Sequence, residues 1–168
     1  MLTPLQKQAA QAIVNIFETG TARGRYGQVT LLAGDSGHLT YGRAQTTLAS
    51  GNLHLLIKAY CEAAGASAGA ALEAYLDRLL RRDLSLDRNA CFRELLRAAG
   101  DDPVMQAEQD AFFDRVYWEP AVKSADFIAA RTALGTAVVY DSRVHGSWHL
   151  LRDRARAQHG ALEALGEE

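Results

Sequence analysis

The chain has 168 residues, of which 48% are hydrophobic and 23% are charged, and its formal net charge is -2 at pH 7. This length suits one compact domain or one domain of two small lobes, so residues 1–168 are interpreted as a single domain. A net charge this small gives no electrostatic argument for a nucleic acid or an acidic membrane surface as a partner. No segment is both long and apolar enough to span a bilayer, and residues 1–14 lack the basic and apolar regions of a signal peptide.

The first predicted element is a helix that begins at Thr3-Pro4 and ends near Gly20. Threonine is a favoured N-cap and proline is favoured at the first helical position, while glycine is typical of a helix end. Between them, apolar residues recur with the period of a helix at Leu5, Ala9, Ala12, Ile13, Ile16 and Phe17. Glu18 therefore lies in the last turn of this helix.

Residues 21–42 differ from the helix before them, because they are rich in glycine and threonine. The run 28–32 favours a strand, Gly34-Asp35-Ser36-Gly37 favours a turn, and residues 38–41 favour a returning strand. The sequence therefore predicts a short antiparallel hairpin or a three-stranded ribbon with a polar loop.

After Gly42 the sequence predicts helices. One begins at Gly51-Asn52 and another is capped by Asp101-Asp102-Pro103. Further helices are expected at about residues 70–82, 87–99, 121–132, 133–143 and 148–165, with Pro120 breaking or restarting the path. We expect the Ala-Gly-rich segment 63–71 to join an N-terminal lobe to a helical lobe. The predicted fold class is α+β, predominantly α, with one small antiparallel ribbon near the start.

The two cysteines, Cys61 and Cys91, both fall in predicted helices. Two buried free thiols are the ordinary interpretation, and a disulfide is the alternative. Because no pair of Cys or His residues has the spacing of metal ligands, the sequence predicts no metal site and no cofactor.

Glu18 and Asp35 are the candidate catalytic pair, since glycoside hydrolysis needs two carboxyl groups in contrasting environments. Glu18 follows Ile16 and Phe17, and these apolar neighbours are expected to raise the pKa of its carboxyl and keep it protonated near neutral pH. Asp35 lies in a polar turn, whose backbone N–H groups favour its ionised form. Thr40, five residues later, is a candidate to hold a water beside Asp35. A solvated glutamate and an aspartate that only forms a turn are the alternative, which spacing alone favours.

Four segments of the chain, in the same order, resemble the inverting bacterial chitosanases of the lysozyme superfamily. These segments are residues 13–18, 34–42, 108–122 and 134–146. The resemblance implies a lysozyme-like fold of two lobes with a cleft that binds a polysaccharide. It also implies that Glu18 is the general acid, Asp35 the general base and Thr40 the residue that positions the attacking water. The carboxyls of such an inverting pair are expected roughly 6.5–9.5 Å apart.

Three features depart from the pattern of these chitosanases. Asn52 stands where they carry an aspartate that helps to recognise a free amino sugar, and Gly37 stands where they carry an arginine. They also continue beyond the length of this chain and there supply arginines for an aspartate that resembles Asp141. Arg143 is therefore the expected partner of Asp141, and the resemblance implies a trimmed domain of a longer protein.

Three more residues are candidates for binding sugar. Tyr26 and Tyr41 carry rings that can stack on the apolar face of a pyranose, although packing in the core is the ordinary role of such rings. His38 lies beside the loop that carries Asp35 and is expected to hydrogen-bond a sugar, with a solvated loop histidine as the alternative. Together with Asn52, these residues form the predicted substrate-binding set.

The substrate expected first is the peptidoglycan glycan strand, cut by a muramidase, because the neutral amide of Asn52 removes a charge that would pair with a glucosamine ammonium. Chitosan, cut by a chitosanase, is the second candidate. A non-catalytic cell-wall-binding module with the same scaffold is the third. An antibacterial use, as an interbacterial toxin or a phage-type lysin, would add further domains or an immunity protein as partners. In each case the expected place of action is the cell wall, the periplasm or the outside of the cell.

Overall fold

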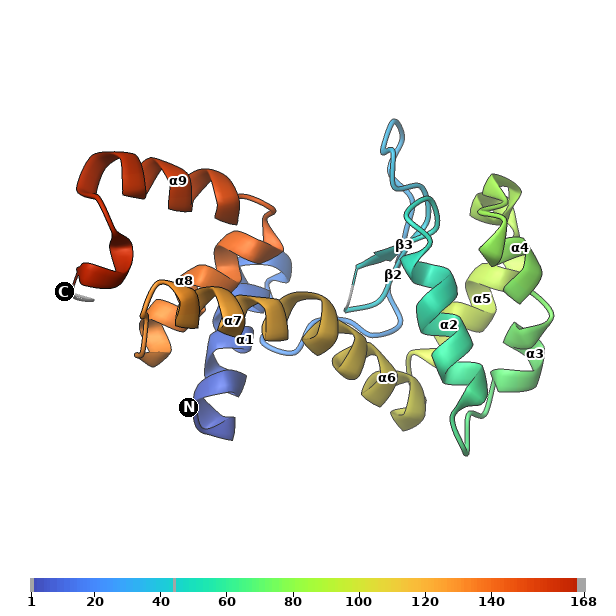
Figure 1. Cartoon of the computed structure of the whole chain (residues 1–168). Coiled ribbons are helices and arrows are strands. Elements are labelled where there is room, and N and C mark those ends of the chain that lie inside the picture. The colour runs from blue at the N-terminus through green and yellow to red at the C-terminus, as the bar shows by residue number, and fades with distance from the viewer. Residues whose placement is uncertain (1, 44, 166–168) are drawn as a thin grey trace. The chain divides into compact units, whose positions relative to one another are not determined.

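The chain divides into two units, and each is described by itself. The computed structural model describes residues 2–43 and 45–165, except for the side chains of Glu18 and Thr19 (Figure 1). The first unit combines Met1–Arg23 with Phe113–Glu168, and the second is Gly24–Phe112. The segment 63–71, which was expected to join two lobes, lies inside the second unit, so the division falls elsewhere.

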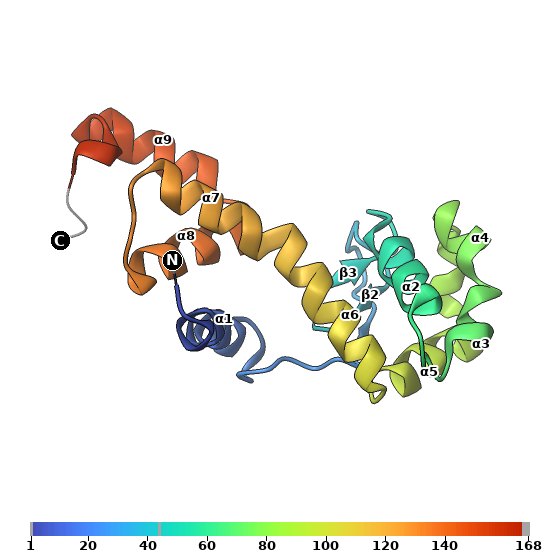
Figure 2. The ribbon, with the colours of Figure 1, turned by 60° about the horizontal axis from the view of Figure 1, so that its bottom comes forward.

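The first helix, α1 (Pro4–Thr19), has the boundaries that the sequence predicts; Figure 2 shows it nearly end-on. The Thr3 hydroxyl accepts a hydrogen bond from the N–H of Gln6, and the Gln6 side chain accepts one from the N–H of Thr3. Gly20 ends the helix in a left-handed conformation with φ 72°. These reciprocal bonds satisfy N–H groups that a helix start otherwise leaves unpaired.

The buried face of α1 differs from the predicted one. Ala10 and Val14 are buried, whereas Ile13, Ile16 and Phe17 are exposed. The apolar period correctly predicted a helix. However, apolar residues occur around more of the circumference of α1 than is buried.

The other elements described in the first unit are all helical. They are the π-helical turn η2 (Asp114–Trp118), α7 (Glu119–Phe127), α8 (Ala133–Val144), α9 (Trp148–His159) and the short η3 (Leu162–Ala164). α8 packs against both α1 and α7. Of the two expectations for Pro120, a break or a restart of the path, the structure has the restart, because α7 begins one residue before it and proline is tolerated in the first turn of a helix. The Tyr140 ring lies 5.2 Å from that of Trp118 and 6.1 Å from that of Phe113, which gives this unit an aromatic core.

The ribbon of the second unit is an antiparallel sheet with strand order β1-β2-β3. The strands are β1 (Val29–Thr30), β2 (Thr40–Tyr41) and β3 (Thr46–Thr47). Tyr41 pairs with Val29 on one side and with Thr46 on the other. The three-stranded form is one that the sequence predicts, but β3 lies beyond Gly42, where only helices were expected.

Helices complete the second unit. They are α2 (Asn52–Glu62), α3 (Gly69–Glu73), α4 (Leu76–Leu80), the 3-10 turn η1 (Leu84–Arg88), α5 (Ala90–Ala99) and α6 (Pro103–Phe113). α2 packs against α3, α4 and β3, and α5 packs against β1 (Figure 1). The single helix expected over residues 70–82 is two short helices, α3 and α4. Helices dominate around one small sheet, so the predicted class, α+β and predominantly α, is confirmed.

The segment 63–71 is a tight connection rather than a linker. The Oδ2 atom of Asp102 accepts hydrogen bonds from the Tyr60 hydroxyl (2.7 Å) and from the N–H (2.9 Å) and hydroxyl (2.7 Å) of Ser67. The Tyr60 hydroxyl and then Ser67 hold the pKa of Asp102 well below its usual range. The small residues of this segment therefore form a compact turn, which hydrogen bonds to Asp102 connect to the start of α6.

Gln109 of α6 is fully buried, and its side chain hydrogen-bonds the backbone before β1 and the backbone after β2. Its Nε2 donates to the carbonyl of Tyr26 (2.9 Å), and its Oε1 accepts from the N–H of Arg43 (2.8 Å). Gly42 has φ 69°, and a Cβ atom there would lie 2.1 Å from Oε1 of Gln109. The ribbon can approach α6 this closely because residue 42 is a glycine.

Gly100, at the end of α5, lies against Gly27 in the segment before β1. A Cβ atom on Gly100 would lie 2.1 Å from the Cα and 2.3 Å from the N of Gly27. Because these contacts are with backbone, Gly100→Ala forces α5 and the ribbon apart, and we expect it to lower the free energy of unfolding by about 3 kcal/mol. Urea denaturation followed by circular dichroism measures this loss.

Gly69→Ala is the matched control for Gly100→Ala. The nearest atom to a Cβ on Gly69 is the Cβ of Ala66 at 3.2 Å, which is tight but not a backbone collision. The change in unfolding free energy should stay below about 1 kcal/mol for this variant. If Gly100→Ala is as stable as Gly69→Ala, the contact with Gly27 does not constrain the ribbon.

Cys61 and Cys91 are free thiols in the described part of the chain. Cys61 is half-buried and its Sγ donates to the Gly69 carbonyl (3.4 Å), whereas Cys91 is exposed. The expectation of two buried thiols is therefore wrong for Cys91. Among the described helices, none has the length and apolar character needed to cross a membrane.

Candidate active site

Asp35 lies in an exposed turn between β1 and β2. Its Oδ1 atom accepts the N–H of Gly37 (2.9 Å), and its backbone carbonyl accepts the N–H of His38 (3.3 Å). The side chain thus forms the turn that is the ordinary role of aspartate in this pattern, and it also keeps its carboxylate in contact with solvent. A carboxylate in this position is able to take a proton from a water.

Thr40 and Tyr41 of β2 face opposite sides of the sheet, as consecutive strand residues do. Thr40 is half-buried and its hydroxyl donates to the carbonyl of His38 (3.4 Å). Tyr41 has no exposed surface, and burial raises the pKa of its hydroxyl. The expectation that Tyr41 stacks on a sugar is not met, because its ring lies on the face of the strand that packs into the core.

His38 contacts Asp87, a residue that the sequence reasoning missed. The Nδ1 atom of His38 lies 2.8 Å from Oδ2 of Asp87, and Oδ1 of Asp87 accepts the N–H of Leu39 (2.9 Å). Asp87 is 8% exposed and comes from η1. His38 and Asp87 are 49 positions apart, and no local pattern links residues at that separation.

Glu18 lies in the last turn of α1, as predicted, and its side chain is outside the described part of the structure. Its neighbours Ile16 and Phe17, which were expected to surround the carboxyl, are both exposed. Glu18 belongs to the first unit and Asp35 to the second. The expected separation of the two carboxyls therefore stays a prediction.

Asn52 is the first residue of α2 and is half-buried. Its N–H donates to the Ser50 hydroxyl (3.2 Å), and the first turn of α2 contains no acidic residue. A Cβ atom on Gly51 would lie 3.4 Å from the guanidinium of Arg82, so a positive charge lies close to the start of this helix.

Gly37, where the resemblance to the chitosanases implies an arginine, lies against β3. A Cβ atom at this position would lie 3.1 Å from Cγ2 of Thr47 and 3.3 Å from Oδ1 of Asp35. A larger residue here would require Thr47 to move. The glycine therefore allows the Asp35 turn to pack closely on the sheet.

The expected ion pair between Asp141 and Arg143 does not form. Asp141 lies 3.6 Å from Nδ1 of His145, and Nε of Arg143 donates to the hydroxyl of Ser124 (3.0 Å). Residues two apart on a helix point in different directions, whereas residues four apart share a face. Asp141 therefore reaches His145, one turn further along α8.

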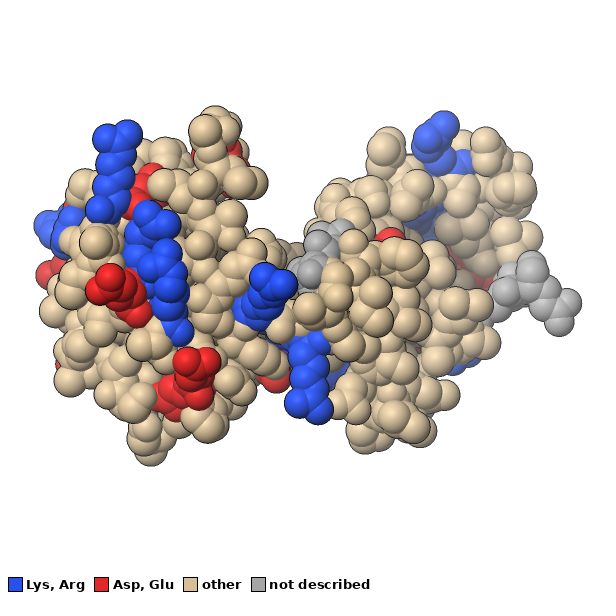
Figure 3. Space-filling view, turned by 180° about the vertical axis from the view of Figure 1, so that it is seen from behind, with Lys and Arg blue, Asp and Glu red and all other residues tan. Residues whose placement is uncertain are grey.

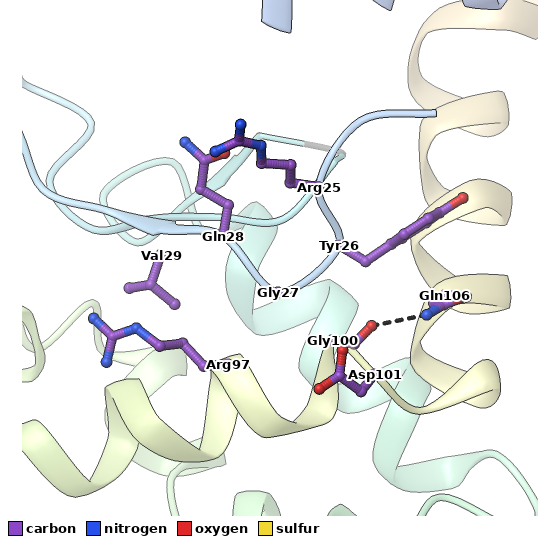
Figure 4. A pocket seen from close by; sticks show the side chains of 9 residues that line it. All are labelled: Arg25, Tyr26, Gly27, Gln28, Val29, Arg97, Gly100, Asp101 and Gln106. Carbon is purple, nitrogen blue, oxygen red and sulfur yellow. Dashed lines mark hydrogen bonds between the residues drawn. The ribbon is translucent and has the colours of Figure 1, made fainter. Parts of the chain in front are cut away.

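Tyr26 lines a pocket of about 520 Å³ in the second unit (Figure 4). Its hydroxyl donates to the carboxylate of Asp110 (2.9 Å), and Arg43 also pairs with Asp110. Figure 4 shows the Arg25 and Arg97 side chains around the opening. The pocket is lined by charges of both signs, because Asp101 lies beside these two arginines, and the other predicted site residues do not line it.

Charges of both signs share the surface. Figure 3 shows Lys and Arg side chains interspersed with Asp and Glu, with much uncharged surface between them. Over the residues that the structure describes, no three His, Cys, Asp or Glu side chains are grouped so that they could hold a metal ion.

Comparison with known proteins relates the sequence to a family. The sequence model of Glycosyl hydrolase family 46 matches residues 12–167. A chitosanase from Bacillus subtilis (strain 168) is 34% identical over 146 residues, which make up 84% of this chain and 51% of the relative. The chain therefore spans about half the length of this curated relative.

Solved structures of chitosanases are similar to the chain as well. A mutant chitosanase from Bacillus subtilis MY002 complexed with 6 GlcN gives a TM-score of 0.81 at 28% identity, covering 96% of this chain and 70% of that one. The complex of a Gynuella sunshinyii chitosanase with chitotetraose gives 0.83 at 25% identity, covering 100% of this chain and 72% of that one. The lysozyme-like fold expected from the resemblance is thereby confirmed.

Proposed function

The chain belongs to glycosyl hydrolase family 46, and we propose that it hydrolyses the β-1,4 bonds of chitosan, as a chitosanase. The observation that carries this proposal is the 34% identity with a chitosanase over 84% of the chain. The likeness to chitosanases complexed with 6 GlcN and with chitotetraose supports it. Because the chain spans about half of the curated relative, activity of these 168 residues is itself part of the proposal. The substrate is a large polymer, so the proposed place of action is outside the cell.

Chitosan replaces peptidoglycan as the first candidate substrate. The expectation of a muramidase depended on Asn52 alone, and the nearby Arg82 guanidinium also favours a neutral sugar at that position. This observation concerns one position, whereas the likeness to chitosanases extends over most of the chain. A neutral amide beside an arginine is better accounted for by a chitosanase that tolerates an N-acetylated unit at this point.

In the proposed mechanism, Glu18 protonates the glycosidic oxygen while Asp35 takes a proton from the attacking water. The water approaches from the opposite face of the sugar, so the reaction inverts the configuration at the anomeric carbon. The exposure of Asp35 supports its part, because the carboxylate is open to solvent and is held in one orientation by the N–H of Gly37. Thr40 is proposed to accept a hydrogen bond from this water with its hydroxyl oxygen.

Incubation of the chain with chitosan and, in parallel, with purified peptidoglycan tests the proposed function. Mass spectrometry should find glucosamine oligomers from chitosan and no muropeptides from peptidoglycan. Proton NMR of the earliest chitosan products should show the α-anomer, since inversion of a β bond forms it first. Muropeptides as the only products would instead support a muramidase. Binding to chitosan without any product would mean a non-catalytic module.

A further inference from the structure

Asp87 is a buried carboxylate that contacts two consecutive residues of the Asp35 loop, which we define as residues 35–40. Its Oδ2 lies 2.8 Å from Nδ1 of His38, and its Oδ1 accepts the N–H of Leu39 (2.9 Å). A buried carboxylate is costly unless hydrogen bonds satisfy it. Both oxygens of Asp87 are used on this loop, although η1, which carries it, is remote from the loop in sequence.

The Asp35 loop has a conformation that needs such support. His38 has φ 59°, in the left-handed region that residues other than glycine rarely adopt. Asp87 contacts the residue with this conformation through the His38 ring and the next residue through the Leu39 amide. Leu39 is also fully buried, so the loop is anchored where Asp87 binds it. Asp35 precedes this anchor by three residues, and Thr40 follows it directly.

The contact with Asp87 also determines the form of the His38 ring. A carboxylate accepts the proton of Nδ1–H, and in the neutral ring this leaves Nε2 as a hydrogen-bond acceptor. The His38 side chain is 34% exposed, and its Nδ1 is the ring atom that contacts Asp87. In this tautomer Nε2, which is not the atom that contacts Asp87, is an acceptor to which a sugar hydroxyl or ammonium can donate.

We propose that Asp87 is a positioning residue, which orients the loop that carries Asp35 and Thr40 and fixes His38 with Nε2 as an acceptor for substrate. This inference rests on the proposed function of Asp35 and Thr40. Asp87 of η1 thereby joins the residues that support catalysis. His38 has one defined tautomer, whereas a freely solvated histidine exchanges between two.

Asp87→Asn tests this role with little change in size. The amide oxygen can still accept the Leu39 N–H, but the NH2 group can only donate to Nδ1, so the variant holds His38 in the Nε2–H tautomer and removes the acceptor at Nε2. We expect kcat on chitosan to fall about 10- to 100-fold, as for a misplaced catalytic group, with a smaller change in KM. His38→Ala, which removes one of the two contacts, should lower kcat less, and combining the two changes should cost less than the product of their separate effects.

Asp83→Asn is the matched control. Asp83 caps the same η1 segment and binds Ser85 and Arg78, but it does not contact the Asp35 loop. Its replacement should disturb η1 without changing kcat. Equal losses in Asp83→Asn and Asp87→Asn, or an unchanged kcat in Asp87→Asn, would overturn the positioning role.

A measurement that does not depend on turnover separates this inference from the proposed function. Amide hydrogen exchange at Leu39 should be faster in Asp87→Ala, which removes both oxygens, than in wild type, and nitrogen-15 spectra of His38 should lose the Nδ1–H tautomer in Asp87→Asn. Unchanged exchange and tautomer would refute the inference even if activity falls. If the wild-type chain cleaves neither polymer, the proposed function fails, and these spectra alone decide whether Asp87 orders the loop.

Discussion

Replacement of Glu18 with glutamine is expected to lower kcat on chitosan by about 10²- to 10⁴-fold, the contribution of a general acid. Glutamine has nearly the same size as glutamate but has no proton to give to the leaving oxygen. Binding of the polymer should persist, because the amide keeps the hydrogen-bonding shape of the acid. Reducing-end assays with glucosamine oligomers, together with binding measured by calorimetry, check both parts of this expectation.

A substrate whose leaving group needs no protonation tests whether Glu18 acts as an acid. In a dinitrophenyl glycoside the leaving group departs without protonation. The loss of kcat in Glu18→Gln should therefore be much smaller on such a substrate. Glu119→Gln, an exposed glutamate at the start of α7, is the control and should leave both rates unchanged. An equally large loss on both substrates would point to a role for Glu18 other than proton donation.

Asp35→Asn is expected to reduce kcat by about 10²-fold or more on every substrate, because a general base is needed whatever the leaving group. The asparagine oxygen can still accept the N–H of Gly37 that Oδ1 of Asp35 accepts at 2.9 Å, so the turn should keep its shape. The loss therefore measures the chemistry and not the fold. Initial rates on chitosan oligomers and on the dinitrophenyl glycoside provide the test.

Asp101→Asn is the control for Asp35→Asn, since Asp101 is another exposed carboxylate of the second unit that lies before α6. Its replacement should leave the rates as in wild type. Recovery of activity in Asp35→Asn on the activated glycoside would contradict the base role and assign proton donation to Asp35 instead. The opposite responses of the Glu18 and Asp35 variants to the leaving group thus distinguish the two carboxyls.

Local patterns made several parts of the fold predictable. The Thr3 cap and the glycine end of α1 depend on hydrogen bonds between residues a few positions apart, and Gly51-Asn52 is typical of the helix start that α2 has there. The turn at Asp35 is equally local, because its oxygen binds an N–H two residues on. The resemblance of four short segments to the chitosanases depends only on the order of residues, so the family was also accessible.

Other predictions failed because they needed knowledge of which faces pack together. Apolar residues occur around more of α1 than is buried, and periodicity alone did not separate Val14 from Ile13. Tyr41 is hidden from any sugar because its side of β2 packs into the core. The partner of Asp141 depends on the helical spacing that places His145 on the same face.

By itself, the sequence determined the class of the fold, both ends of the first helix, the start of the second, the catalytic candidates and the family, because each of these depends on residues that are close together in the chain. Only the tertiary structure decided that Asp87 binds the loop of Asp35, that Lys7 pairs with Asp114, and that the chain divides at residues 23 and 112. These contacts join residues far apart in the chain, and the free energy that selects them comes from the burial and packing of whole elements.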